Sequence, residues 1–375
     1  MAKKIKPAAN RANKRSLTKA AHKLATHLDK ETSPTKKDSK NANLHKAKIA
    51  KDDEYYTMLA DIESEMEAYL EKNADVFHNK TVLCPCDDPT WSMFTVWFVN
   101  NFRRIGLKKL ICTGYHKGGH GVKYVLDGDT NGNGRIDVGD IVAEDMEGDG
   151  DFRSAEVAAL LPEVDFIITN CPFSLGREFF AWVLESGKKF SFIWTLNCIT
   201  YKEVFPAIKD GKAWLGKGFK GGNAFFKVGS GKTADDYAKG VFDETTGQVK
   251  FRNCIWLTNI DHGRRHDKLS LMTMAENKKY SRHKEVRGHD YQQYDNYQAL
   301  EIPFTDAIPS DYTGIMGVPI SFLQAHNPDQ FEIVGCSYEY GDCGKHIDGT
   351  PWGCEINGEA IYKRLFIKAK SKKKK

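Results

Sequence analysis

A short apolar run ends in an asparagine and a proline in the stretch Asp165-Phe166-Ile167-Ile168-Thr169-Asn170-Cys171-Pro172-Phe173. Apolar and β-branched residues in a row, without polar alternation, favour a strand that is covered on both faces. Pro172 has no backbone N–H to donate, so the strand must turn out of the sheet there. The stretch therefore predicts a buried strand that carries Asn170 at its carboxyl end.

Further apolar runs on both sides of this stretch alternate with segments of helical periodicity. Strands are expected at residues 81–84, 109–113, 165–169 and 190–194, and helices at residues 92–102 and 175–186. Buried strands that alternate with helices are joined by right-handed crossovers, which predicts an α/β fold with a doubly wound, mostly parallel sheet. Ligands of such sheets bind beyond the carboxyl ends of the strands, where Asn170 is expected.

The two ends of the chain differ from its body in charge. Residues 1–51 and 363–375 are rich in lysine and arginine, although the net charge of all 375 residues is only +5. We expect a disordered N-terminal arm and a basic C-terminal tail, which would contact phosphate backbones; a merely solubilising tail has the same composition. Apolar residues at three- and four-residue spacing from Tyr55 to Leu70 predict an amphipathic helix, so the folded part is expected to begin at Asp52.

The chain carries no sign of a membrane or secretory protein. No apolar run of about 18 residues is present, and the N-terminus is polar and basic, so a cytoplasmic protein is expected. The nine cysteines are an odd number, which together with their apolar neighbours predicts reduced thiols and no disulfide. A zinc site is not expected, because paired ligand spacing is absent from a late cluster formed by Cys336, Cys343, His346 and Cys354.

Residues 231–362 form a region of different character, with short strands, loops and many basic, aromatic and amide side chains. Arginine can make bidentate contacts to base edges, and tyrosine can stack on an unpaired base. We therefore expect a smaller, mixed α/β recognition region for nucleic acid, with the solvated surface of a second domain as the alternative. Its candidate contact residues are Arg264, Arg265, His266, Lys268, Arg282 and Arg287.

The residues at the end of the central strand suit the recognition of an exocyclic amine. The amide oxygen of Asn170 and the backbone carbonyl of Cys171 are two acceptors that one NH₂ group can use at the same time. Phe173 offers an aromatic face for a base that has left a duplex. This chemistry requires neither a nucleophile nor a metal ion.

Asn170-Cys171-Pro172-Phe173 resembles the Asn-Pro-Pro-Phe motif of the EcoRI-type adenine-specific DNA methyltransferase family. The tetrapeptide by itself indicates only an amino-nitrogen methyltransferase, but the resemblance extends from about Leu44 to Lys370. Seven further strings follow in family order: DEYYT at 53–57, CPCDDP at 84–89, GDGDFRS at 148–154, ITYKE at 199–203, WLTN at 256–259, YDNY at 294–297 and GIMGVP at 314–319. These strings point to adenine in DNA.

The resemblance implies a Rossmann-like catalytic domain at residues 52–230 that uses S-adenosylmethionine. Its catalytic residues would be Asn170, Cys171, Pro172 and Phe173, and its cofactor-binding residues Tyr56, Thr57, Cys84, Pro85, Cys86, Asp87, Asp151 and Phe152. Asp151 would accept a hydrogen bond from the adenine of the cofactor and Phe152 would pack on that ring; an acidic loop with one anchoring aromatic is the alternative. Cys171 replaces the family's second residue, a proline, but only its carbonyl is needed.

The implied reaction transfers a methyl group to the N6 amino group of an adenine flipped out of double-stranded DNA. The same resemblance implies a cognate restriction endonuclease as partner, a monomeric protein, and a bacterial or phage-infected host cell. Two alternatives stay open. One is a methyltransferase-like DNA-binding protein without catalysis, and the other is an RNA or protein-glutamine N-methyltransferase.

An acidic insertion at residues 127–147 contains oxygen-bearing side chains at the spacing of a calcium loop, with glycine at the sixth position. It resembles dockerin and EF-hand loops, which predicts a structural calcium ion; an acidic hairpin without metal is the alternative. The predicted ligands are Asp129, Asn131, Asn133, the carbonyl of Arg135, Asp137 and Asp140.

Overall fold

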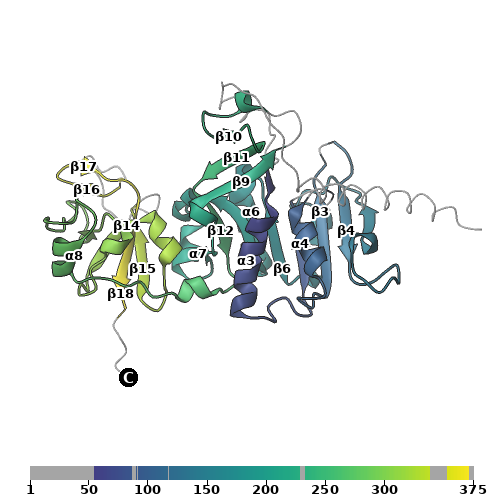
Figure 1. Ribbon diagram of the computed structural model, residues 1–375, viewed down its shortest axis with the longest axis horizontal. Helices are drawn as coiled ribbons and strands as arrows, with labels where there is room; N and C mark the ends of the chain where they lie inside the picture. The colour runs from purple at the N-terminus through teal and green to yellow at the C-terminus, as the bar shows by residue number, and fades with distance from the viewer. Residues whose placement is uncertain are drawn as a thin grey trace, which may run out of the picture. The chain divides into compact units, whose positions relative to one another are not determined.

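The computed structural model describes residues 55–86, 90, 92–116, 118–228, 233–337 and 353–370 (Figure 1). The basic arm expected at residues 1–51 lies outside them. The chain forms two compact units. The first contains the described residues up to Trp194 together with Phe219–Ile260, and the second contains Thr195–Gly218 and the residues from Asp261 onward. The boundary expected at residue 230 falls inside the first unit.

The first unit is built on a large mixed sheet, in which the strand order within this unit is β5-β4-β3-β2-β6-β7-β12. Its strands are β2 (Thr81–Cys84), β3 (Lys109–Gly114), β4 (Val122–Leu126), β5 (Val142–Asp145), β6 (Phe166–Asn170), β7 (Lys189–Thr195) and β12 (Cys254–Thr258). Strands β3, β2, β6 and β7 are parallel neighbours, as expected. The pairs β3–β4 and β4–β5 are antiparallel, so the sheet is more mixed than predicted. The connection from β3 to β4 is too short for a helical crossover and returns the chain antiparallel.

Helices cover the parallel strands, which explains their unbroken apolar sequences. They are α3 (Leu59–Lys72), α4 (Met93–Asn101), the short α5 (Ala155–Ala158) and α6 (Gly176–Ser186). Helix α4 is buried from Met93 to Val99, and the Ser92 hydroxyl caps it by accepting a hydrogen bond from the Phe94 backbone N–H at 3.2 Å. Helix α6 packs Phe179 against Phe192 of β7, with ring centroids 5.0 Å apart. The expected helices at residues 92–102 and 175–186 are thus confirmed.

The helix expected from Asp52 is shorter than predicted and begins at Leu59. The residues before it form β1 (Tyr55–Thr57), which pairs with β9 (Asn223–Val228) in a second sheet of order β1-β9-β11-β10. The other strands of this sheet are β10 (Phe242–Asp243) and β11 (Gln248–Arg252). Tyrosine and threonine favour strands, and the backbone of Met58 is extended. The three-residue spacing between Tyr55 and Met58 therefore did not indicate a helix.

The second unit contains a sheet of order β13-β14-β18-β15 together with short helices. Its elements are α7 (Phe205–Lys209), β8 (Trp214–Leu215), α8 (Met274–Tyr280), β13 (Leu300–Glu301), β14 (Ile315–Pro319), β15 (Phe331–Cys336), β16 (Glu355–Ile356), β17 (Glu359–Ala360) and β18 (Arg364–Ala369). Strand β18 corrects the basic tail expected at residues 363–375. Its run from Leu365 to Ile367 is fully buried between β14 and β15, a signal that the surrounding lysines obscured.

Cys354 is disulfide-bonded, so the expectation of no disulfide is wrong. An odd cysteine count does not prevent the fold from bringing two thiols together. The described cysteines that form no disulfide are Cys84, Cys86, Cys112, Cys171, Cys198, Cys254 and Cys336. Within the described ranges, no helix has both the length and the apolar character needed to span a bilayer.

Candidate active site

Asn170 is the last residue of β6 and is 8% exposed, as predicted from the apolar run before it. It pairs in register with Ile193 of β7, and the parallel strand β2 lies on the other side of β6. The carboxyl ends of β2, β6 and β7 therefore meet at one edge of the sheet. Directly after it, the Leu175 backbone N–H donates to the Pro172 carbonyl at 2.9 Å, which closes the turn that leads into α6.

The ring of Phe173 is held by the second sheet of the same unit. It meets Phe226 of β9 edge to face, with centroids 6.3 Å apart, and Phe251 of β11 in the same manner at 5.9 Å. Such edge-to-face pairs stabilise aromatic rings in a defined orientation. Phe173 is only half-buried, so part of its ring is accessible to another planar group.

Cys171 is buried at 1% exposure, and its Sγ lies 3.9 Å from the carbonyl oxygen of Ile193. The side chain is a small apolar filler against β7, which is the usual role of an inert cysteine. The thiol thus faces the sheet, and only the backbone of this residue is available for polar recognition.

Gly176 allows α6 to begin in contact with the end of β7. A Cβ at this position would lie 2.2 Å from the Trp194 ring, and Trp194 is itself 2% exposed. Neither the strand nor the ring has space to retreat. The glycine thereby fixes the start of α6 next to the Asn170–Phe173 turn.

We expect Gly176→Ala to lower the free energy of unfolding by about 1–3 kcal/mol, the usual cost of overpacking a dense core. The shift of the urea midpoint measures this loss. Gly128→Ala is the matched control, because a Cβ at Gly128 would have no atom within 4 Å. Equal midpoints for the two variants would contradict the contact with Trp194.

The loop that carries Asp151 is fixed at the carboxyl end of β3. Gly150 has a φ of +78°, and a Cβ there would lie 2.3 Å from the carbonyl oxygen of Gly114. The backbone N–H of His116 donates to the Asp149 carbonyl at 2.8 Å. Only glycine permits this close approach and this backbone conformation. The structure thus brings the Asp151 loop to the edge of the sheet at which β3 ends.

The carboxylate of Asp151 is held by Arg153 in a bidentate pair. Arg153 Nε donates to Oδ1 at 2.9 Å and Nη2 donates to Oδ2 at 2.7 Å. The hydrogen bond from Arg153 holds the pKa of Asp151 below its ordinary value. The Arg153 backbone N–H also donates to Oδ1, at 2.8 Å. A carboxylate has about four lone-pair directions, so an ionised Asp151 retains capacity for one more donor.

Phe152 is 4% exposed and packs edge-on against two rings of α6. The centroid distances are 5.2 Å to Phe179 and 5.5 Å to Trp182. This packing is expected of an aromatic side chain that anchors an acidic loop, which is the alternative given for Phe152 above. It supports that role for Phe152 more directly than stacking on a cofactor ring.

The other cofactor candidates lie on β1 and after β2. Thr57 is 3% exposed, and its Oγ1 is buried without a hydrogen-bond partner among the described residues. Cys84 ends β2 and is followed by Pro85, whose carbonyl accepts from Thr113 Oγ1 at 3.4 Å. Tyr56 pairs with Lys227 through its backbone, and Asp87 lies outside the described residues. An unsatisfied buried hydroxyl on β1 suits a polar ligand, because burying it alone is costly.

The acidic loop does not support the predicted calcium ion. Among the described residues, no group of three or more histidine, cysteine, aspartate or glutamate side chains could hold a metal. The loop's oxygens accept its own N–H groups instead: Asp129 Oδ2 accepts from Gly134 at 2.7 Å and Asp137 Oδ1 from Gly139 at 2.7 Å. Asp140 is fully buried and accepts from the Asn131 N–H at 3.1 Å. The side-chain oxygens of Asn131 and Asn133 also accept within the loop, from the backbone N–H groups of Asn133 at 3.0 Å and Arg135 at 2.7 Å.

The six basic candidates of the second unit have different surroundings. Arg264 and Arg265 lie on one turn and line the same cavity. His266 Nε2 is 2.8 Å from Asp261, and Arg282 is paired with Asp306 at 3.0 Å. Lys268 and Arg287 are exposed. The cavity also contains Trp214 and Lys370, distant in sequence from the arginines, which sequence reasoning missed because no local pattern connects them.

Comparison with known proteins adds to this geometry. Residues 43–372 match the family model described as adenine-specific methyltransferase EcoRI. The chain is 39% identical to the Type II methyltransferase M.EcoRI of Escherichia coli, over 88% of this chain and 97% of that protein. It is 30% identical to M.MpnI of Mycoplasma pneumoniae (78% and 85% covered) and to M.MgeORF184P of Mycoplasma genitalium (78% and 86% covered). No solved structure matches the chain.

Proposed function

This chain belongs to the EcoRI family of adenine-specific DNA methyltransferases, and on that premise we propose how its own residues flip, hold and methylate an adenine in double-stranded DNA. Three relatives are named Type II methyltransferases, which supports DNA over RNA or a protein glutamine as the substrate. The same names support a role beside a cognate restriction endonuclease. A Rossmann-like description of the first unit agrees with its parallel strands β3, β2, β6 and β7.

The observation that carries the proposal is the position of Asn170 at the carboxyl end of β6, directly before a proline turn and a half-buried phenylalanine. Asn170 and the Cys171 carbonyl accept the two hydrogens of the adenine N6 amino group. Phe173 stacks on the flipped base, which offsets part of the few kcal/mol that extrusion from the duplex costs. The acceptors stabilise the positive charge that develops on the nitrogen, and the fixed turn aligns it for attack.

S-adenosylmethionine supplies the methyl group when bound, on a sulfonium that is electrophilic without further activation. The residues present fit this cofactor. Asp151 offers an ionised acceptor for an amino group, Thr57 offers a buried hydroxyl, and the glycine contacts at the end of β3 allow close approach of the Asp151 loop. The segment from Cys84 to Cys86 lies at the same edge, because β2 and β3 are parallel neighbours.

Long-read sequencing of DNA from cells that express the protein tests the proposal. We expect N6-methyladenine at every copy of one short sequence motif, and at none in cells that carry the empty vector. Unmodified DNA, together with a tight duplex complex of the purified protein, would instead support the non-catalytic alternative.

A further inference from the structure

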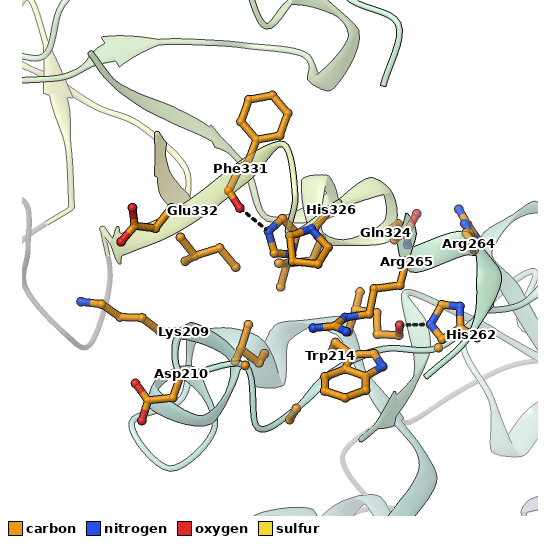
Figure 2. Close-up of a pocket in the computed structure, with 18 of the residues that line it drawn as sticks. Lys209, Asp210, Trp214, His262, Arg264, Arg265, Gln324, His326, Phe331 and Glu332 are labelled. Atoms are coloured by element: carbon orange, nitrogen blue, oxygen red, sulfur yellow. Dashed lines mark hydrogen bonds between the residues drawn. The ribbon is translucent and has the colours of Figure 1, made fainter. Parts of the chain in front are cut away.

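A cavity of about 200 Å³ lies wholly within the second unit (Figure 2). Four parts of the chain contribute to its lining: residues 208–211 and 213–216, the turn that carries His262, Arg264 and Arg265, residues from the segment between Leu323 and Ile333, and Lys370. Its apolar lining residues include Ile208, Leu215 and Leu323. A cavity of this size has room for several water molecules, each of which occupies about 30 Å³.

The guanidinium of Arg265 lies at the centre of this cavity, between Trp214 and the segment that carries His326 (Figure 2). Its Cζ is 3.8 Å from the centroid of the Trp214 ring. The side chain is 19% exposed, and its Nε is buried without a hydrogen-bond partner among the described residues. Stacking on tryptophan orients the planar fork of Arg265 before any ligand binds.

The charge of Arg265 is only partly compensated. Its Nη1 is 3.6 Å from Asp261 Oδ1, too far for a good hydrogen bond. The same carboxylate oxygen is 2.8 Å from His266 Nε2. Arg265 therefore shares its nearest counter-charge with a histidine, although it is mostly removed from water.

The remaining lining groups leave the cavity positive. Lys209, Arg264 and Lys370 add permanent cations, whereas the carboxylates that line the cavity are Asp210 and Glu332. Asp210 is itself 3.4 Å from Lys212, which lies outside the cavity.

Two histidines of the cavity add no charge near neutral pH. His262 Nε2 is 2.9 Å from the Leu215 carbonyl and His326 Nε2 is 3.1 Å from the Phe331 carbonyl, so both nitrogens donate (Figure 2). Burial lowers the pKa of both rings. The excess positive charge thus comes from lysine and arginine.

We propose that this cavity binds a backbone phosphate of the DNA substrate, with Arg265 as the principal ligand. The inference rests on the proposed function for its choice of DNA. An oriented guanidinium fork matches two phosphate oxygens, and apolar walls strengthen the pair by excluding water. A backbone contact of this kind positions the protein without reading the sequence.

Fluorescence anisotropy with a labelled 30-base-pair duplex, titrated at several salt concentrations, tests the site. We expect Arg265→Ala to weaken duplex binding by about tenfold or more, as for loss of a charge-assisted hydrogen bond. The slope of log K against log salt should shrink by about one, because one phosphate contact is lost. Lys370→Ala should have a smaller effect in the same direction. Lys108→Ala removes an exposed cation of the first unit, directly before β3 and not part of the cavity, and should change neither quantity.

Arg265→Lys keeps the charge without the fork and should recover only part of the affinity. This variant also protects the test if Arg265→Ala fails to fold. Unchanged affinity and salt slope in both Arg265 variants would overturn the proposal. A second result would also overturn it. If inorganic phosphate or adenosine monophosphate quenches tryptophan fluorescence in the wild type but not in the Arg265 variants, while all of these proteins bind the duplex with equal affinity, the cavity serves a small phosphate ligand. Methylation of cellular DNA by the wild-type protein is measured in a separate experiment. A failure of the proposed function is therefore distinguishable from a failure of the phosphate site.

Discussion

Asn170→Ala should reduce methyl transfer by at least about a hundredfold, while the fold and cofactor binding remain. Removal of a single preorganised hydrogen-bonding group in an active site commonly costs about 10²–10³ in rate. Here the loss should be at the upper end, because the side chain both holds the amino group and stabilises its developing charge. Asn170 is the last residue of the buried strand β6, so truncation of its side chain should leave the strand in place.

Single-turnover transfer of a labelled methyl group to unmodified cellular DNA measures the effect, and calorimetric titration with S-adenosylmethionine checks the cofactor site. Asn170→Asp retains acceptor oxygens and should recover part of the rate. Asn101→Ala is the matched control, because it removes the same type of side chain from the C-terminal end of α4. There the side chain of Asn101 donates to the Trp97 carbonyl and accepts from Arg104 Nε. Near-normal turnover in Asn170→Ala would remove Asn170 from the mechanism.

The position of Asn170 could be predicted from sequence because several local signals agree there. An unbroken apolar run, a single polar residue and a proline define the strand, its end and the turn. The partners of Phe173 could not be predicted in this way. Phe226 and Phe251 are more than fifty residues further along the chain, on strands of a second sheet. Their alternating patterns resemble any half-buried strand, so only the fold shows which ring they hold.

Three errors of the sequence analysis share one physical cause. In each, a local sequence pattern predicted a structure that the contacts of the segment in the fold then overrode. The lysines around β18 suggested a solvated tail, yet Leu365, Phe366 and Ile367 are fully buried. The periodicity from Tyr55 suggested one helix, yet the first three residues pair with β9. The spacing in the acidic loop matched a calcium site, yet its oxygens accept the loop's own N–H groups. Strand pairing and backbone hydrogen bonding decided these segments.

Arg364, the first residue of β18, provides the second large effect. Arg364→Met should lower the free energy of unfolding by about 3–5 kcal/mol, because it leaves the Glu301 carboxylate buried without its counter-charge. The two side chains are 11% and 8% exposed. Arg364 Nη2 donates to Glu301 Oε1 at 2.6 Å and Nε donates to the same oxygen at 3.0 Å, while the Tyr294 hydroxyl donates to the other oxygen.

The loss should appear as a lower urea midpoint, and a double variant separates its causes. If the cost comes from the stranded carboxylate, adding Glu301→Gln to Arg364→Met should restore most of the stability, since the amide oxygen still accepts from Tyr294 without bearing charge. Lys368→Met removes an exposed cation from the same strand and should change stability by no more than about 0.5 kcal/mol. An Arg364→Met variant as stable as Lys368→Met would show that Glu301 needs no counter-charge, and that the ion pair does not stabilise β18.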